Sequence, residues 1–307
     1  MITERGACAG RTPPDDQPPL PVELVTASPA PAVPVNIVFA GGCSHAAALP
    51  AGPAIDPPDA AARLSAGYAR LSQDIAAAAP DLMIVITDRH QQSFSTGTFV
   101  VGTGERHTGS MAVRDRPDLD LSLKGMPAYA YAIADCLRAE GVEVTEVGRV
   151  DLDHGLIVPL RELLPRPGIP VVPIVTQPAR GFSPFGARSF GEVLRYVVEA
   201  REERIAVLAT GGLSHRLDPG EVGNSDVEFD SHVLQMLHDG RGPELGDLDP
   251  YTLLRHGHHE FLNWLVMLGM IGPGVRGEVY AYEPMPQSGG ARAVVNMLLS
   301  ERKTPAA

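Results

Sequence analysis

Three residues of types that bind metal ions follow or interrupt the apolar segments of this chain. His45 follows the first short apolar run, His90 follows the second, and Glu260 lies inside a long late segment with helical signals. Two imidazoles and one carboxylate on one face of an octahedral ion leave three positions open, the arrangement typical of non-haem Fe(II) oxygenases. We therefore take His45, His90 and Glu260 as candidate metal ligands.

Two further histidines lie in turns made of small residues. His154 belongs to the segment Asp153-His154-Gly155-Leu156, and His215 ends the segment Gly211-Gly212-Leu213-Ser214-His215. An imidazole at the end of a strand can take up a proton and return it near neutral pH. His154 and His215 are therefore candidates for acid and base chemistry.

The other histidines have a plainer interpretation. A single His is more often a hydrogen-bonded structural residue than a ligand, and we expect three in polar segments to be exposed and inert: His107, His232 and His238. Three more crowd Glu260 and could suggest a zinc site made of histidines: His256, His258 and His259. On a continuous helix only His256, four residues earlier, would share the face of Glu260, so we consider that zinc site the weaker alternative.

Composition excludes several classes of protein. The 307 residues are 44% hydrophobic, which indicates a soluble globular chain, and acidic residues outnumber basic ones by 37 to 25 without a basic cluster that could follow a nucleic acid. No apolar run approaches the roughly 20 residues of a membrane-spanning helix. The three cysteines, Cys8, Cys43 and Cys136, cannot form a complete disulfide framework, so a reducing cytoplasm is expected.

Alternating strand and helix patterns predict an α/β fold. We expect a single domain with a central mixed sheet flanked by helices and an active site at the strand ends, because ligands collect there in open α/β sheets. Residues 1–34, rich in proline, are expected to form an extension that is disordered or draped on the surface, and residues 35–307 the catalytic domain. The expected strands are 35–40, closed by Gly41-Gly42, then 82–87, 142–147, 171–175, 205–209 and 277–282, and the expected helices are 60–79, 128–140, 190–203, 250–270 and 291–299.

In order along the chain, five of these segments resemble motifs of the class III extradiol ring-cleavage dioxygenases, the superfamily of the protocatechuate 4,5-dioxygenase β-subunit. The resemblance covers roughly residues 35–300. The matching segments are Gly42-Cys43-Ser44-His45, residues 81–94 around His90, Asp153-His154-Gly155 with Pro159-Leu160, Thr210-Gly211-Gly212-Leu213-Ser214-His215, and His259-Glu260 with Trp264 and Gly269.

The resemblance implies an enzyme that uses Fe(II), without an organic cofactor, to insert both atoms of O2 into a catechol-type substrate and open its ring. Gallate-like compounds and 2-aminophenols are included in that class. The metal would be held by His45, His90 and Glu260. His215 would act as acid and base, and His154 would hold oxygen or substrate.

The resemblance also places three residues on the substrate side of the site: Asp88, Asp153 and Ser288. Asp88-Arg89 replaces the Asn-Asp pair that relatives often have before the second His. In the protocatechuate enzymes a Ser-Asn pair holds the substrate carboxylate, and the comparable stretch here is Pro286-Gln287-Ser288-Gly289-Gly290. This departure argues against protocatechuate itself as the substrate.

Two other functions remain possible for the same candidate ligands, and two kinds of protein partner are expected or possible. A relative of the same fold could bind metal without catalysis, because a fold does not dictate a function. A zinc-dependent hydrolase could use the same three ligands. Besides the aromatic substrate and O2, we expect a homo-oligomer, and a small accessory subunit could cover the active site, as in some relatives.

Overall fold

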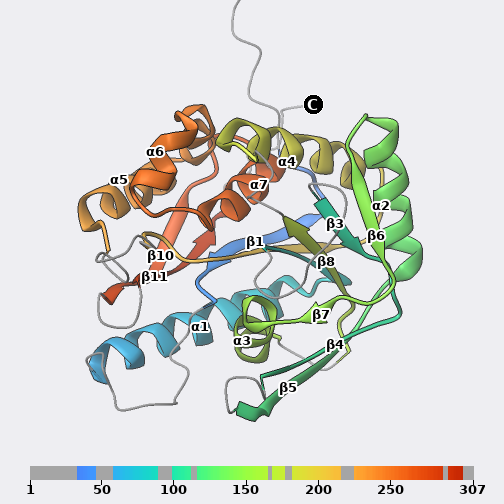
Figure 1. Ribbon diagram of the computed structural model, residues 1–307, viewed down its shortest axis with the longest axis horizontal. Coiled ribbons are helices and arrows are strands. Elements are labelled where there is room, and N and C mark those ends of the chain that lie inside the picture. The colour runs from blue at the N-terminus through green and yellow to red at the C-terminus, as the bar shows by residue number, and fades with distance from the viewer. Residues whose placement is uncertain are drawn as a thin grey trace, which may run out of the picture.

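The computed structural model describes residues 33–45, 58–88, 99–111, 116–164, 168–176, 182–215, 225–285 and 290–299, and these form a large sheet between two layers of helices (Figure 1). The strands are β1 (Ile37–Cys43), β2 (Leu82–Asp88), β3 (Phe99–Gly102), β4 (Arg106–Met111), β5 (Arg116–Lys124), β6 (Val144–Val147), β7 (Asp151–Leu152), β8 (Val171–Thr176), β9 (Ile205–Thr210), β10 (Gly277–Met285) and β11 (Gly290–Met297). The helices are α1 (Pro58–Ala78), α2 (Pro127–Ala139), α3 (His154–Leu163), α4 (Pro184–Glu199), α5 (Val227–His238), α6 (Pro250–Arg255) and α7 (Phe261–Ile271), with the 3₁₀ helix η3 (Gly242–Asp247).

The large sheet is mixed, as the sequence predicts. Its order is β10-β11-β1-β9-β2-β8-β3-β6. The four central strands β1, β9, β2 and β8 are parallel, whereas β11 is antiparallel to β1 and β3 is antiparallel to β8. A second, smaller sheet has the order β5-β4-β7. The α/β fold is therefore confirmed, and the parallel centre brings several carboxyl ends of strands to one edge.

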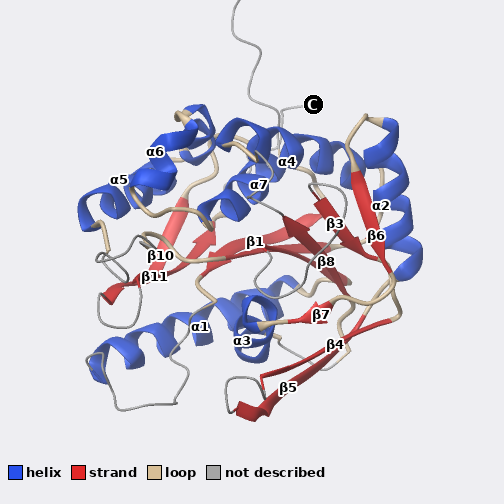
Figure 2. Ribbon diagram, viewed as in Figure 1, coloured by secondary structure: helices blue, strands red, loops and turns tan. Residues whose placement is uncertain are grey.

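Side-chain alternation along the central strands explains the two helical layers. In β2, Ile84 and Ile86 pack with α2, α4 and α7 on one face, and Met83 and Val85 pack with α1 and α3 on the other. Figure 2 shows helices on both faces of the sheet. Central strands that are covered on both faces need apolar residues at every position, which is why β2 is a continuous apolar run.

Three expected elements differ in the structure. β1 continues through Gly41-Gly42 to Cys43, because both of its edges are paired, with β9 and with β11. The segment 291–299, expected as a helix, is mainly strand β11, which hydrogen-bonds between β1 and β10. The expected long helix 250–270 is divided into α6 and α7, since Gly257 adopts the left-handed conformation (φ 74°) that ends a helix.

Most of the proline-rich extension, residues 1–32, lies outside the described residues, so the prediction for it stays open. Val33 is partly buried and packs against the main hydrophobic core. Within the described segments, no helix combines the length and apolarity required to cross a membrane.

Gly42 in β1 lies directly against Trp264 in α7. Trp264 is fully buried, and a Cβ atom placed on Gly42 would lie 2.6 Å from two carbons of its ring. That separation is shorter than a van der Waals contact, so only glycine lets the indole lie flat against the strand. The glycine interpreted from the sequence as part of a turn is therefore a packing position.

We expect Gly42→Ala to lower the free energy of unfolding by about 1–3 kcal/mol, because the added methyl overpacks the core at Trp264. Urea unfolding followed by Trp fluorescence measures this, since Trp264 is the only tryptophan. The matched control is Gly148→Ala, where an added Cβ meets nothing within 4 Å. Equal unfolding midpoints for the two variants would contradict the prediction.

His107 is buried, contrary to the expectation that it is exposed. It lies in β4 with no exposed surface, and its Nδ1 accepts a hydrogen bond from the Val150 amide at 3.1 Å. The apolar neighbours of the small sheet enclose the ring, and this burial lowers the pKa of His107 to about 4. His232 and His238 are exposed, as expected.

This burial predicts a pH dependence of stability. The pKa of His107 is about 4 in the folded chain against an ordinary 6.5, so between these values the unfolded chain binds more protons and acidification favours unfolding. The contribution of neutral His107 to the free energy of unfolding is fully present above pH 6.5. About 2 kcal/mol of it is lost between pH 7 and pH 5. Urea unfolding at pH 7 and at pH 5 gives the difference in the free energy of unfolding between the two pH values. We expect this difference to be smaller by about 2 kcal/mol in His107→Asn than in the wild type. His232→Asn, on the surface, should leave the difference unchanged.

Candidate active site

His45 extends from the carboxyl end of β1, and the residue before it is held on three sides. The Ser44 amide donates to the Ala293 carbonyl at 2.9 Å, and the Ser44 hydroxyl accepts from the Ala293 amide at 2.9 Å. Tyr68 of α1 donates its hydroxyl to the Ser44 carbonyl. These bonds tie the end of β1 to β11 and α1 and fix the backbone directly before His45, which is buried and 3% exposed.

Glu260 lies at the start of α7 rather than inside a helix. Its Oε2 accepts a hydrogen bond from the Gly212 amide at 2.5 Å, directly after β9. One turn further along α7, the Trp264 indole donates to the Gly211 carbonyl at 3.1 Å. The two bonds dock the beginning of α7 on the turn after β9, and the other oxygen of Glu260, Oε1, lies toward His45.

The structure brings His45, Glu260 and His154 together. Nε2 of His45 lies 3.1 Å from Oε1 of Glu260, and the rings of His45 and His154 meet edge to face with centroids 5.1 Å apart. A buried imidazole nitrogen and a carboxylate oxygen this close together are ligands suited to Fe(II) or Zn(II). These two side chains therefore fit a divalent metal ion.

The third candidate ligand, His90, lies outside the described residues, as does Ser288. Among the residues that the structure does describe, no group of three or more potential ligands surrounds a common point. The full ligand set therefore remains a prediction from the sequence, with two of its members adjacent in the structure.

Asp153 sets the position of His154. Its carboxylate caps α3 by accepting from the Gly155 amide at 2.9 Å, and His154 is the first residue of that helix. His154, predicted from the sequence to lie in a turn of small residues, instead begins a helix that contains Pro159. The buried Asp153 carboxylate is thus engaged with the backbone beside the candidate site.

Asn263 is a buried polar residue that sequence analysis missed. Its amide nitrogen donates to the Asp88 carboxylate at 3.1 Å and to the Thr210 carbonyl at 2.8 Å, and its oxygen accepts from the Thr176 hydroxyl at 2.8 Å. Asn263 thereby joins α7 to the ends of β2, β8 and β9 and orients candidate Asp88. The available signal was an amide in an otherwise apolar helix, three residues after Glu260.

His215 lies at the end of the turn after β9. Its amide donates to the Gly257 carbonyl at 2.8 Å, and the carbonyl of the preceding Ser214 accepts from Ala291 at 2.8 Å. The turn is therefore held between the loop that leads to Glu260 and the start of β11, and the half-buried His215 is bonded through its backbone to the loop that carries the candidate carboxylate ligand.

The alternative zinc site among the late histidines is not assembled. Because the helix is interrupted, His256 does not share a helical face with Glu260. Its Nδ1 instead lies 2.7 Å from a carboxylate oxygen of Asp226, and Nε2 of His258 lies 2.9 Å from Asp230. These two histidines therefore have acidic partners on α5 and at its cap.

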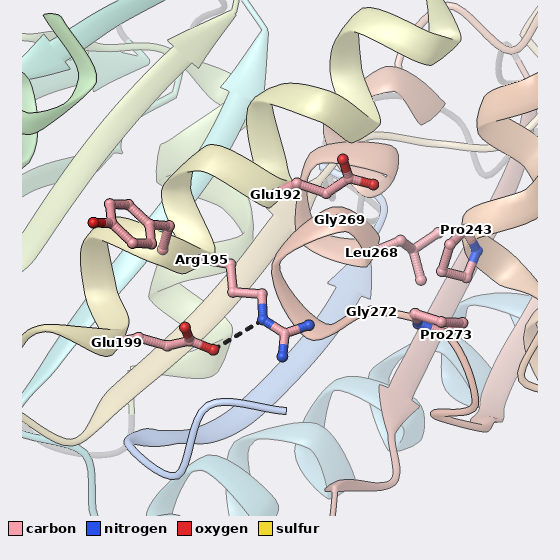
Figure 3. A pocket seen from close by; sticks show the side chains of 9 residues that line it. Glu192, Arg195, Glu199, Pro243, Leu268, Gly269, Gly272 and Pro273 are labelled. Carbon is pink, nitrogen blue, oxygen red and sulfur yellow. Dashed lines mark hydrogen bonds and ion pairs between the residues drawn. The ribbon is translucent and has the colours of Figure 1, made fainter. Parts of the chain in front are cut away.

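Cavities among the described residues include one beside α4 and one beside α6. One, of about 520 Å³, is lined by α4 and the end of α7, where Arg195 Nε bonds Glu199 at 3.0 Å (Figure 3). None of the candidate site residues lines it. The other, of about 260 Å³ and mainly apolar, reaches His259, the neighbour of Glu260, and contains Phe182 and Tyr251. Of these two cavities, only the second reaches a residue adjacent in sequence to a candidate ligand.

Comparison with known proteins identifies relatives of the chain. Gallate dioxygenase of Pseudomonas putida is 27% identical over 187 residues, which cover 58% of this chain and 54% of that protein. The 2,3-dihydroxyphenylpropionate/2,3-dihydroxicinnamic acid 1,2-dioxygenase of Xanthobacter autotrophicus is 30% identical over 169 residues, 52% of this chain and 51% of that protein. The match to this chain thus spans about half the length of these relatives.

A solved structure has the same fold. It is that of an uncharacterized protein from Escherichia coli K12, with a TM-score of 0.59 and 17% identity over 84% of this chain and 98% of that chain. The family described as the catalytic LigB subunit of aromatic ring-opening dioxygenase matches residues 41–295, a segment that contains every candidate ligand and acid–base residue. The chain belongs to this family of class III extradiol dioxygenase catalytic subunits.

Proposed function

We propose that this chain is an Fe(II)-dependent extradiol dioxygenase that opens the ring of a catechol-type substrate. The observation that carries the proposal is the 3.1 Å approach of His45 Nε2 to Glu260 Oε1, in a chain of the LigB family. With His90 as the third ligand, these residues would hold the ion on one face. When bound, Fe(II) would supply the redox chemistry that lets a spin-paired aromatic compound react with O2.

The proposed net reaction breaks one ring carbon–carbon bond next to a hydroxylated carbon and adds both oxygen atoms of O2 to the product. The relatives are named for gallate and 2,3-dihydroxyphenylpropionate, which supports an aromatic substrate with adjacent hydroxyl groups. The apolar cavity beside His259, lined by Phe182 and Tyr251, offers a surface that suits an aromatic ring. Gallate-like compounds and 2-aminophenols belong to the same proposal.

The chain's own residues would handle the protons of this reaction. His215 would take a proton from a substrate hydroxyl and return it to an O2-derived oxygen as the oxygen–oxygen bond breaks, and that oxygen stays in the product. His154, whose ring meets that of His45 edge to face, would hydrogen-bond oxygen or substrate. Asp88, oriented by Asn263, and Ser288 would contact the substrate, while Asp153 would act through the helix that it caps.

The proposal extends to the whole chain and its surroundings. Residues 35–307 would form the catalytic domain. Cys136 is an exposed thiol, which suits the reducing cytoplasm proposed as the location. Assembly as a homo-oligomer, or with a small accessory subunit over the active site, is part of the same proposal.

Removal of a ligand should remove the metal and the activity together. The Glu260→Gln variant keeps an oxygen that can accept from the Gly212 amide but loses the carboxylate charge. We expect it to bind less than one iron per chain and to consume oxygen at least about 100-fold more slowly than the wild type. This loss exceeds the usual effect of removing a residue that only hydrogen-bonds to a metal ligand. Anaerobic Fe(II) loading, metal analysis and oxygen-electrode assays with gallate, catechols and 2-aminophenols measure both. Glu278→Gln, a surface carboxylate paired with Arg70, is the matched control. Bound zinc with no oxygen uptake in the wild type would instead favour the hydrolase.

Loss of the proposed acid and base should spare the metal. We expect His215→Ala to bind iron like the wild type but to lower kcat by about 10²- to 10⁴-fold, the usual contribution of general acid–base catalysis. Formation of ring-opened product, followed by its visible absorbance, measures kcat. His232→Ala, on the exposed face of α5, is the control and should keep full activity. Full activity of His215→Ala would exclude this role.

A further inference from the structure

Asp230 of α5 is a buried carboxylate with no place in the reaction described so far. It has no exposed surface, although it lies in the first turn of a surface helix. A buried charge is costly unless hydrogen bonds satisfy it. The partners of Asp230 therefore indicate what its burial achieves.

Three donors bond Asp230, two of them from one residue, and a histidine lies close by. Oδ1 accepts from the Ser214 amide at 2.9 Å, and Oδ2 accepts from the Ser214 hydroxyl at 2.8 Å. Oδ2 also accepts from the Tyr282 hydroxyl of β10 at 2.7 Å, and Oδ1 lies 2.9 Å from Nε2 of His258. Such a set of donors suits an ionised carboxylate that acts as a fixed anchor.

Ser214 immediately precedes His215, and its polar atoms are all engaged. Besides the two bonds to Asp230, its hydroxyl accepts from the Asp226 amide at 2.7 Å, and its carbonyl accepts from Ala291. A residue with every polar atom bonded has one backbone orientation. The direction in which the chain enters His215 is thus set by the carboxylate on α5.

Asp230 also contacts the loop that leads to Glu260. His258, its partner at 2.9 Å, lies two residues before Glu260, and the carbonyl of Gly257, the residue before His258, accepts from the His215 amide. The Tyr282 phenol stays a donor, because burial and then its hydrogen bond to Asp230 raise its pKa well above the ordinary value. One carboxylate therefore meets both segments that supply the proposed chemistry.

We infer that Asp230 is a positioning residue for acid–base catalysis: through Ser214 it fixes the turn that presents His215 to the substrate. The inference rests on the proposed role of His215. Acid–base catalysis requires the imidazole within hydrogen-bond reach of one substrate oxygen. A displacement of about 1 Å can lower the rate by about 100-fold, although every reacting group is still present.

The test compares Asp230→Asn with the wild type. In this variant the NH2 group of the new side-chain amide faces groups of Ser214 and Tyr282 that are themselves donors. These hydrogen bonds cannot all form, so the turn that carries His215 should shift. We expect kcat to fall by about 10- to 100-fold, with KM for gallate or 2,3-dihydroxyphenylpropionate and the bound iron within about twofold of the wild type. The matched control is Asp74→Asn, because Asp74 likewise accepts from a tyrosine of β10, Tyr280, and from Asn296, away from His215. This control should keep the wild-type kcat.

A double variant separates positioning of His215 from general damage. In a His215→Ala background, Asp230→Asn should lower the residual kcat by less than about twofold, because the group that it positions is gone. An additional loss of 10-fold or more there, or loss of iron in the single variant, would overturn the inference. If Asp230→Asn does not fold, Ser214→Ala takes its place, since it removes the hydroxyl link but keeps the buried carboxylate with its other donors. The same pattern is then expected.

The outcomes also separate this inference from the proposed function. A wild type that consumes no oxygen with the substrate panel, or a fully active His215→Ala, would overturn the proposed function and with it this inference. An active wild type, an impaired His215→Ala and an unchanged kcat for Asp230→Asn and Ser214→Ala would overturn the inference alone.

Discussion

The parallel alignment of β1, β9 and β2 is the constraint on which the candidate site depends. Parallel strands end at one edge of a sheet, so the loops that follow them meet although they lie far apart in the sequence. His45 follows β1, His215 follows β9 and Asp88 ends β2. The N-terminus of α7 then approaches the same edge and adds Glu260. Without this alignment, the chain would carry the same residues in unrelated places.

Buried hydrogen bonds fix the positions of the loops that the parallel strands bring together. Ser44 is tied to β11 and α1, Asn263 joins α7 to the ends of three strands, and Asp230 holds the turn before His215. An unpaired polar group in an apolar interior costs free energy, so each of these segments has one register in which all its groups are bonded. The residues that would touch substrate are therefore supported by residues that would not.

The chemistry of the site and the family of the chain point to the same kind of reaction. An imidazole nitrogen and a carboxylate oxygen 3.1 Å apart are suited to share a metal ion, and an apolar cavity with Phe182 and Tyr251 in its wall reaches His259, the neighbour of Glu260 in the sequence. The same donor atoms on another fold would equally suit a hydrolase, so membership of the LigB family is what favours ring cleavage over hydrolysis. The proposed ring cleavage therefore joins a local geometry to a family, and neither alone would specify it.

The sequence by itself determined the α/β class, the central buried strands and the family, because apolar runs and short motifs are local properties. It did not determine that the Gly41-Gly42 segment continues β1, that residues 290–297 form a strand, that His107 is buried or that α7 begins after Glu260. Each depends on a partner distant in the chain: β9 and β11 for the glycines, β1 and β10 for the last strand, and the small sheet for His107. Only the tertiary structure revealed the roles of Asn263 and Asp230, since a polar residue in a helix gains its role from what it meets across the fold.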